Sequence, residues 1–176
     1  MIYFEKSTIL PVKASELYRW HMRPEAFETL TPPWEPVKVL QRPLVLEEGS
    51  ELHLQVPLGP LRVLWIARHI HIQPGRRFDD IQVKGPFGSW HHKHLFEPVG
   101  EDATCMRDSI ECSLPAGSLL DGLLGWTVRK KLQRMFDYRH QQLLNLFDAC
   151  TETREHIEKL ANNKYVPEQV QEQLKQ

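Results

Sequence analysis

The chain has 176 residues, a length that fits one domain with a substantial core. Its 22 Lys and Arg residues against 23 Asp and Glu give a net charge of −1, which argues against a nucleic-acid-binding or membrane-surface protein, since either would need clustered positive charge. The chain has no run of eighteen apolar residues and no signal-peptide pattern, and Cys105, Cys112 and Cys150 have no Cys-x-x-Cys spacing, so we expect a cytoplasmic protein with no integral membrane segment.

The first part of the chain predicts one strand and two short helices. Residues 1–10 are apolar-rich and stop at Pro11. Residues 14–21 carry apolar side chains at helical spacing, and residues 24–30 predict a second helix with a proline in its first turn. The helices therefore follow the first strand directly.

From residue 37 to residue 112 the spacing of apolar residues changes from helical to alternating, with turns marked by glycine and proline. This pattern predicts a meander of six antiparallel strands. In residues 62–72 both faces are apolar, so the inward face cannot be chosen from periodicity alone. Trp65 and Arg68 are therefore only possible pocket residues.

The stretch from Gly85 to Pro98, with a strand of about eight to ten residues between its turn residues, is the richest in side chains that could do chemistry. Because alternate residues of a strand share a face, one face carries Trp90, His92, His94 and Phe96, and the other carries His91, Lys93 and Leu95. The next strand, residues 104–112, places Met106, Ile110 and Cys112 on one face. Asp108 lies on this apolar face, where an unpaired carboxylate would be costly, so we expect a histidine or a ligand atom beside it.

After residue 117 apolar residues recur at intervals of three and four, which predicts one helix of about thirty residues. Its expected apolar stripe comprises Leu120, Leu124, Val128, Leu132, Met135, Phe136, Leu143, Leu146 and Phe147. Residues 150–176 are polar and are expected to form a tail, with a possible last short helix.

The chain resembles the SRPBCC superfamily, which includes START domains and polyketide cyclases, and in particular bacterial cyclase/dehydrase-like ligand-binding proteins sometimes labelled cell-division inhibitors. The resemblance covers residues 1–149 and is carried by Phe78-x-Asp80-x-Gln82, Gly85-Pro86-Phe87-x-x-Trp90-x-His92-x-His94-x-Phe96, Thr104-x-Met106-x-Asp108-x-Ile110, Leu114-Pro115 and Phe136-x-Tyr138-Arg139-His140. It implies an α+β helix-grip fold, in which a curved antiparallel sheet of about seven strands wraps around the long C-terminal helix.

The resemblance also implies a cavity that holds a small, mostly apolar molecule. The expected ligand-binding residues are Asp80, Gln82, Trp90, His92, His94, Phe96, Met106, Asp108, Ile110, Phe136 and His140. For His92 and His94 four roles stay open: a structural pair with an aspartate, ligand contact, metal binding or proton transfer. We expect no metal and no cofactor, because the sequence has no His-Glu-x-x-His motif, no Cys pair and no glycine-rich phosphate loop.

Three functions are compatible with these residues. The first is a binding module, monomeric or weakly dimeric, that carries, sequesters or senses a lipid, quinone or polyketide-like molecule. The second is a cyclase/dehydratase-like enzyme that uses His92, His94 and Asp108 for proton transfer. The third is an interaction module that has no ligand and acts through residues 150–176.

Overall fold

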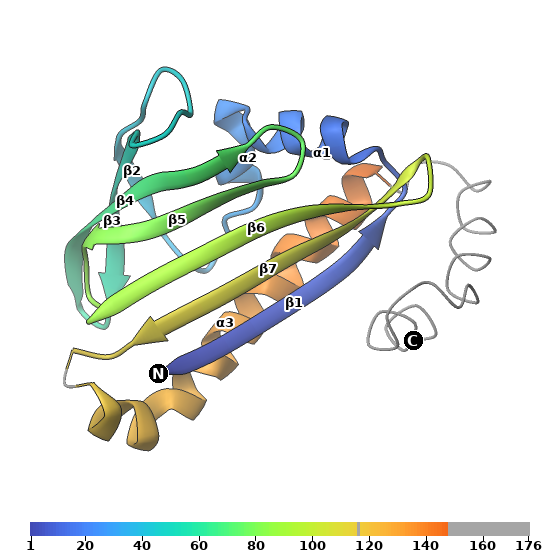
Figure 1. The fold of residues 1–176 in the computed structure, drawn as a ribbon. Coiled ribbons are helices and arrows are strands. Elements are labelled where there is room, and N and C mark those ends of the chain that lie inside the picture. The colour runs from blue at the N-terminus through green and yellow to red at the C-terminus, as the bar shows by residue number, and fades with distance from the viewer. Residues whose placement is uncertain (116, 148–176) are drawn as a thin grey trace.

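The computed structural model describes residues 1–115 and 117–147, and its helices and strands follow the predicted order (Figure 1). The elements are β1 (Ile2–Leu10), α1 (Ala14–His21), α2 (Pro24–Thr29), β2 (Lys38–Gln41), β3 (Glu51–Leu58), β4 (Leu61–Gln73), β5 (Arg77–Lys84), β6 (Ser89–Val99), β7 (Ala103–Ser113) and α3 (Ser118–Phe147). The predicted tail, residues 150–176, lies outside the described residues, and so does the boundary expected at residue 149.

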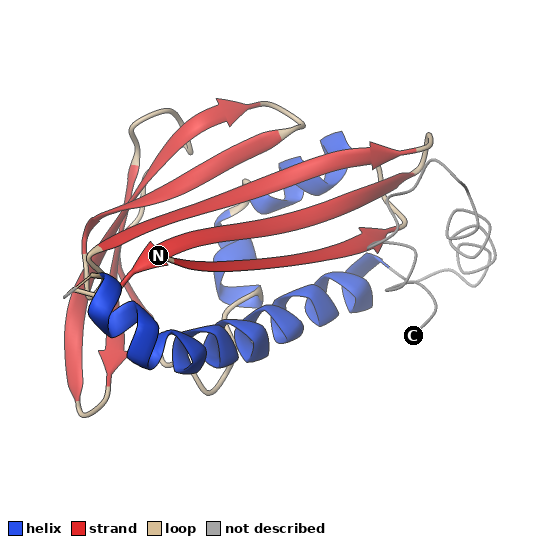
Figure 2. Cartoon of the chain, turned by 60° about the horizontal axis from the view of Figure 1, so that its bottom comes forward, coloured by secondary structure: helices blue, strands red, loops and turns tan. Residues whose placement is uncertain are grey.

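The seven strands form one antiparallel sheet in the order β1-β7-β6-β5-β4-β3-β2. The sheet is curved, and α3 runs along one of its faces, behind β1, β7 and β6 in Figure 1. Figure 2 shows the same helix from below, lying lengthwise against the strands. We call the face toward α3 the concave face. This arrangement confirms the predicted α+β helix-grip fold.

The alternation predicted for β6 and β7 is confirmed by burial and by register. His92 pairs across the ladder with Ile110, and His94 pairs with Asp108. All four side chains are buried, because they lie on the concave face beneath α1 and α3. Two packed groups of apolar side chains flank them, one centred on Phe96 beneath α1 and one that includes Phe136 of α3.

The buried stripe of α3 differs from the one that its leucines predict. Leu124 is 42 % exposed and Leu146 is 45 % exposed, although both were expected to face the sheet. The helix approaches β1 through Gly125 instead, where an added Cβ would lie 3.3 Å from Cγ1 of Ile2. From this close contact the buried side continues along the helix through Leu132, Phe136, His140 and Leu143. The stripe was wrong at these two leucines because local spacing does not show how far the sheet extends beneath a helix.

The inward face of β4 is settled by the structure. Ala67 and His69 are buried on the concave face, and the Trp65 ring packs against Trp90 at 5.1 Å between ring centroids. Arg68 points the other way and donates to Glu51. Trp65 therefore belongs to the concave face, and Arg68 belongs to the outer face.

Candidate functional site

Asp108 is the centre of a buried polar network on the concave face. His92 Nε2 donates to Asp108 Oδ1 at 2.8 Å, and His140 Nε2, from α3, donates to Asp108 Oδ2 at 2.9 Å. His94 Nδ1 lies 2.9 Å from Asp108 Oδ1 as an ion pair, although its N–H does not point at that oxygen. The expected histidine partners of Asp108 are therefore present, and they come from two elements far apart in the sequence.

A second carboxylate extends the network to β5 and β4. His94 Nε2 donates to Asp80 Oδ2 at 3.2 Å, so the His94 ring bridges two aspartates. On the other side of Asp80, His69 Nε2 lies 3.2 Å from Oδ1. At the far end, His140 Nδ1 lies 2.7 Å from the hydroxyl oxygen of Thr8 in β1. The result is a chain of alternating imidazoles and carboxylates that runs across the sheet.

Charges within this chain complement one another. Burial by itself would raise the pKa of Asp108, but the charge of His94 and the hydrogen bonds from His140 and His92 hold it well below its usual range. Asp80 behaves in the same way, and its pKa falls to about 2. Burial would lower the pKa of His94, but the charges of Asp108 and Asp80 and the hydrogen bond to Asp80 raise it. The two carboxylates therefore favour the charged form of the His94 imidazole that lies between them.

The neighbouring imidazole behaves differently. Burial lowers the pKa of His92 to about 4, with a further lowering contribution from the charge of His94, whose ring centroid lies 3.8 Å away. Burial also lowers the pKa of Arg139, while the charges of Asp108 and Asp80 act to raise it. The surroundings thus favour the neutral form of His92 and the charged form of the neighbouring His94, and Arg139 is a further cationic side chain near the two carboxylates.

Protein atoms enclose the centre of the network, whereas the Asp80 side chain at its edge is 21 % exposed. His92, His94, Asp108 and His140 are between 1 % and 4 % exposed. Phe78 stacks on the His94 ring at 4.1 Å, and Phe136 meets the His92 ring edge-on at 5.3 Å. Because its polar atoms contact one another and its faces are covered by aromatic rings, this network can hold charge in the core with no ligand atom to complete it.

The other predicted site residues fall into two groups. Phe96, Met106, Ile110 and Phe136 are fully buried and form apolar walls next to the network. Gln82 does not face the network directly, since its side-chain amide donates to the carbonyl oxygen of Phe87 and accepts from the Phe87 N–H. It therefore positions the β5–β6 turn that carries Phe87.

Trp90 lies at the end of the concave face near that turn. Its ring centroid is 4.9 Å from that of Phe87, and both rings contact Trp65 of β4. All three rings remain partly exposed, unlike the neighbouring histidines. We call Trp65, Phe87 and Trp90 the aromatic group.

Three residues of the site were missed by sequence reasoning. His69 joins the network from β4, whose inward face periodicity could not choose. His21 is buried beside Phe96 at 5.0 Å between ring centroids, and its Nε2 has no hydrogen-bond partner within the described part of the chain. Phe78 covers one face of His94.

Two other features bear on ligands. A hollow of about 230 Å³ lies at the surface between Phe27 and Val39, away from the network. Ligand atoms of Asp80, His92 and His94 lie within 4.8 Å of one another, as a metal ion would require. However, His92 Nε2 already donates to Asp108 and His94 Nε2 to Asp80, so an ion would have to displace both hydrogen bonds inside a packed core.

Comparison with known proteins agrees with the fold. A family model described as polyketide cyclase / dehydrase and lipid transport matches residues 10–138. Protein TTHA0849 from Thermus thermophilus is 16 % identical, with a TM-score of 0.64 over 85 % of this chain and 99 % of that one. A START superfamily protein from Mycobacterium smegmatis is 16 % identical, with a TM-score of 0.60, and the match covers 84 % of this chain and 98 % of that one.

A third solved structure is much longer than this chain. The nucleoside-diphosphate sugar epimerase from Corynebacterium glutamicum is 26 % identical with a TM-score of 0.60, and the match covers 90 % of this chain but only 30 % of the epimerase. No curated protein matches the chain. Because the family model spans well over half of the sequence, the chain belongs to the family described as polyketide cyclase / dehydrase and lipid transport.

Proposed function

We propose that this protein binds a small, mostly apolar molecule, such as a lipid, quinone or polyketide-like compound, on the concave face between the sheet and α3. The observation that carries the proposal is the aromatic group, whose three rings remain partly exposed at the edge of an otherwise closed core. Partly exposed aromatic rings beside a few fixed polar groups are the usual composition of a ligand site. Membership of a family described by cyclase, dehydrase and lipid-transport activities supports the same interpretation.

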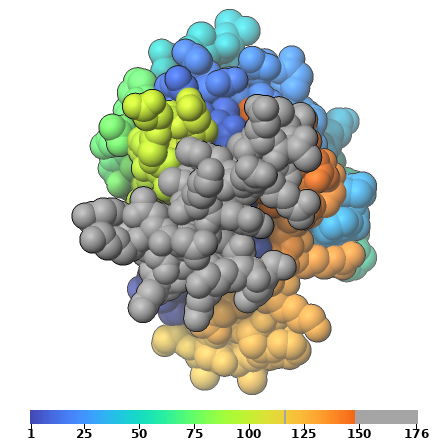
Figure 3. Space-filling view, turned by 90° about the vertical axis from the view of Figure 1, so that its right-hand side faces the viewer, coloured from blue at the N-terminus to red at the C-terminus, as the bar shows by residue number. Residues whose placement is uncertain are grey.

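Exposed apolar side chains at one end of the molecule support a route of access for such a ligand. Leu119, Leu123 and Trp126 at the start of α3 are each more than half exposed, and so is Leu61 at the start of β4. These two segments lie at the same end of the molecule in Figures 1 and 2. The start of α3 forms the lower end of the molecule in Figure 3. An apolar rim of this kind favours the uptake of an apolar molecule.

Proton-transfer catalysis by His92, His94 and Asp108 is the alternative. One observation favours it, namely the neutral His92 imidazole beside the charged His94 imidazole. The near-zero exposure of all three side chains favours binding over catalysis, because a substrate atom would have to enter a packed core to reach them. The interaction module acting through residues 150–176 remains a prediction, and deleting those residues tests it.

The proposal also covers the cellular compartment and the oligomeric state of the protein. Cys105 and Cys112 are buried and form no disulfide within the described residues, which supports a reducing, cytoplasmic compartment. Of the helices in the described part of the chain, none is long and apolar enough to cross a membrane. We propose a monomer or weak dimer with a small apolar ligand as its partner.

The test is native mass spectrometry of the protein purified from its own host, followed by denaturing extraction and identification of the released molecules. We expect a co-purifying apolar molecule that is lost in Trp90→Ala. Trp34→Ala is the matched control, because Trp34 packs on Tyr138 and Arg134 of α3 and belongs to a different surface. A protein that carries no molecule and binds no lipid, quinone or polyketide in a screen would refute the proposal.

If a ligand is found, variants of His92, Trp90 and Asp108 distinguish a binding protein from an enzyme. In a binding protein, His92→Gln lowers affinity modestly, whereas Trp90→Ala lowers it strongly, because most of the contact is apolar. In an enzyme, His92→Gln and Asp108→Asn abolish conversion of the ligand while binding persists.

A further inference from the structure

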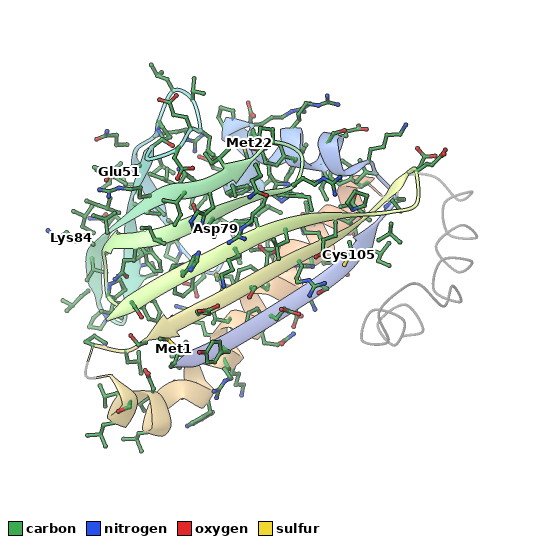
Figure 4. The ribbon with its side chains drawn as sticks, viewed as in Figure 1. Met1, Met22, Glu51, Asp79, Lys84 and Cys105 are labelled. Carbon is green, nitrogen blue, oxygen red and sulfur yellow. The ribbon has the colours of Figure 1, made fainter. Side chains whose placement is uncertain are left out.

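A second cluster of histidine and aspartate side chains lies on the outer face of the sheet, opposite α3. Asp79 of β5, labelled in Figure 4, is fully buried although it points away from the core that holds Phe78 and Asp80. His91 Nε2 from β6 lies 2.7 Å from Asp79 Oδ2, and His71 Nδ1 from β4 lies 3.0 Å from the same oxygen. Three neighbouring strands thus direct two imidazoles and a carboxylate at one point.

His71 reaches this point only because the backbone of β4 is distorted. Strand alternation would place His71 on the concave face, on the same side as His69. Instead the ladder to β5 shifts between Ile70 and Gln73, and His71 has a φ of 53°, the one positive value among the non-glycine residues of the described chain. A left-handed conformation is uncommon for a histidine and costs free energy, and here it turns the imidazole onto Asp79.

The distortion is held in place from outside the strand. The Glu48 carboxylate accepts hydrogen bonds from the backbone N–H groups of His71 and Ile72, each at 3.1 Å. On the other side, Arg77 Nε donates to Asp79 Oδ1 and an Arg77 terminal nitrogen donates to Oδ2, both at 2.6 Å. Glu48 therefore fixes the backbone that carries one imidazole, and Arg77 fixes the orientation of the carboxylate.

The ligand atoms have the spacing that a metal ion requires. One nitrogen of His71, one of His91 and a carboxylate oxygen of Asp79 all lie within 4.8 Å of one another. Around a tetrahedral ion with bonds of about 2.0–2.2 Å, neighbouring ligand atoms are about 3.3–3.6 Å apart. The two nitrogens now lie 3.0 and 2.7 Å from Oδ2 in hydrogen bonds, so an ion would replace the protons between these atoms and move them apart by less than about 1 Å. Two imidazoles and one carboxylate suit zinc and neighbouring transition metals better than magnesium or calcium.

We propose that His71, Asp79 and His91 form a binding site for a divalent transition-metal ion of the zinc class on the outer face of the sheet. The His71 side chain is 57 % exposed and that of His91 is 28 % exposed, so an ion can enter from solvent and retain water in its remaining positions. The site is separate from the proposed ligand site, since the sheet lies between them. Because Arg77 already neutralises Asp79, we expect weaker binding than at a site whose carboxylate has no cationic partner.

The experiment is a calorimetric titration of Zn²⁺ into the metal-free, untagged full chain. We expect one Zn²⁺ per chain, and an affinity about tenfold lower or worse in His71→Asn and in His91→Gln. Asparagine adopts the left-handed conformation more readily than most residues, so His71→Asn keeps the backbone and removes the imidazole. Thermal unfolding of each variant confirms that it is folded.

His53→Asn is the matched control, because His53 also contacts a carboxylate, Glu51, at 3.2 Å on a partly exposed strand. Its affinity for Zn²⁺ should equal that of the wild type. A second readout locates the ion: histidine ring signals of His71 and His91 should shift in NMR spectra on addition of Zn²⁺, while those of His92 and His94 stay unchanged. The proposal is overturned if the wild type binds no Zn²⁺ at about 100 µM, or if His71→Asn and His91→Gln bind it as tightly as the wild type.

Discussion

Replacing Asp108 by asparagine tests whether the network on the concave face is a self-contained element of the core. The asparagine would keep the size of the side chain but remove the charge that His92, His94 and His140 share. Its amide nitrogen would also face an imidazole N–H where a carboxylate oxygen now accepts. The variant therefore leaves donors without an acceptor and the His94 charge with one carboxylate in place of two.

The expected cost follows from burial. Asp108 is 2 % exposed and contacts three imidazoles at 2.8–2.9 Å, so solvent cannot replace the lost partner. Removing one member of a buried charged pair costs about 3–5 kcal/mol in the free energy of unfolding. For a chain of this size each kcal/mol corresponds to about 2–4 °C, so we expect the melting temperature to fall by about 6–20 °C.

Urea unfolding followed by circular dichroism measures this change at pH 7. Asp137→Asn is the control, because Asp137 is half-exposed and pairs with Lys6 at 2.6 Å, an ion pair worth less than about 1 kcal/mol. If Asp108→Asn loses no more stability than Asp137→Asn, then the network does not stabilise the fold. The polar groups would then be free to serve a ligand, and the catalytic alternative would gain weight.

Two further predictions concern pH and the long helix. The folded-state pKa of His92 is about 4, below the usual value of 6.5. The contribution of His92 to the free energy of unfolding is therefore complete above pH 6.5, and about 3 kcal/mol is lost as the pH falls toward 4. The raised pKa of His94 has the opposite effect, a loss of stability as the pH rises, and it acts only above pH 6.5. Urea unfolding at pH 7 and pH 4.5 should show this loss, His92→Gln should reduce it, and equal stability at both pH values would contradict the reasoning. Gly122→Ala should raise stability by about 1 kcal/mol, because an added Cβ meets no atom within 4 Å, whereas Gly125→Ala should gain less because its Cβ lies 3.3 Å from Ile2. Equal melting temperatures for the two alanine variants would show that α3 does not approach β1 as closely as described.

The sequence by itself determined the order of the elements and the faces of the central strands. Alternation along β6 and β7 placed His92, His94 and Asp108 together on a buried face. The cost of burying an unpaired carboxylate then predicted a histidine or a ligand atom beside Asp108, and the structure shows histidines. These predictions succeeded because side-chain direction along a strand is a local property with a period of two residues. The helical spacing after residue 117 predicted the thirty residues of α3, because side-chain direction along a helix is also a local property, with a period of 3.6 residues.

Only the tertiary structure decided which faces meet and which residues pair. The register of β4 against β5 brings His69 to Asp80, and the bulge at His71 turns that imidazole to Asp79 on the opposite face. The exposure of Leu124 likewise depends on where the sheet ends beneath α3. The physical reason is the same in each case: periodicity assigns a side chain to a face, whereas its partners are set by strand register, backbone distortion and the approach of segments distant in sequence.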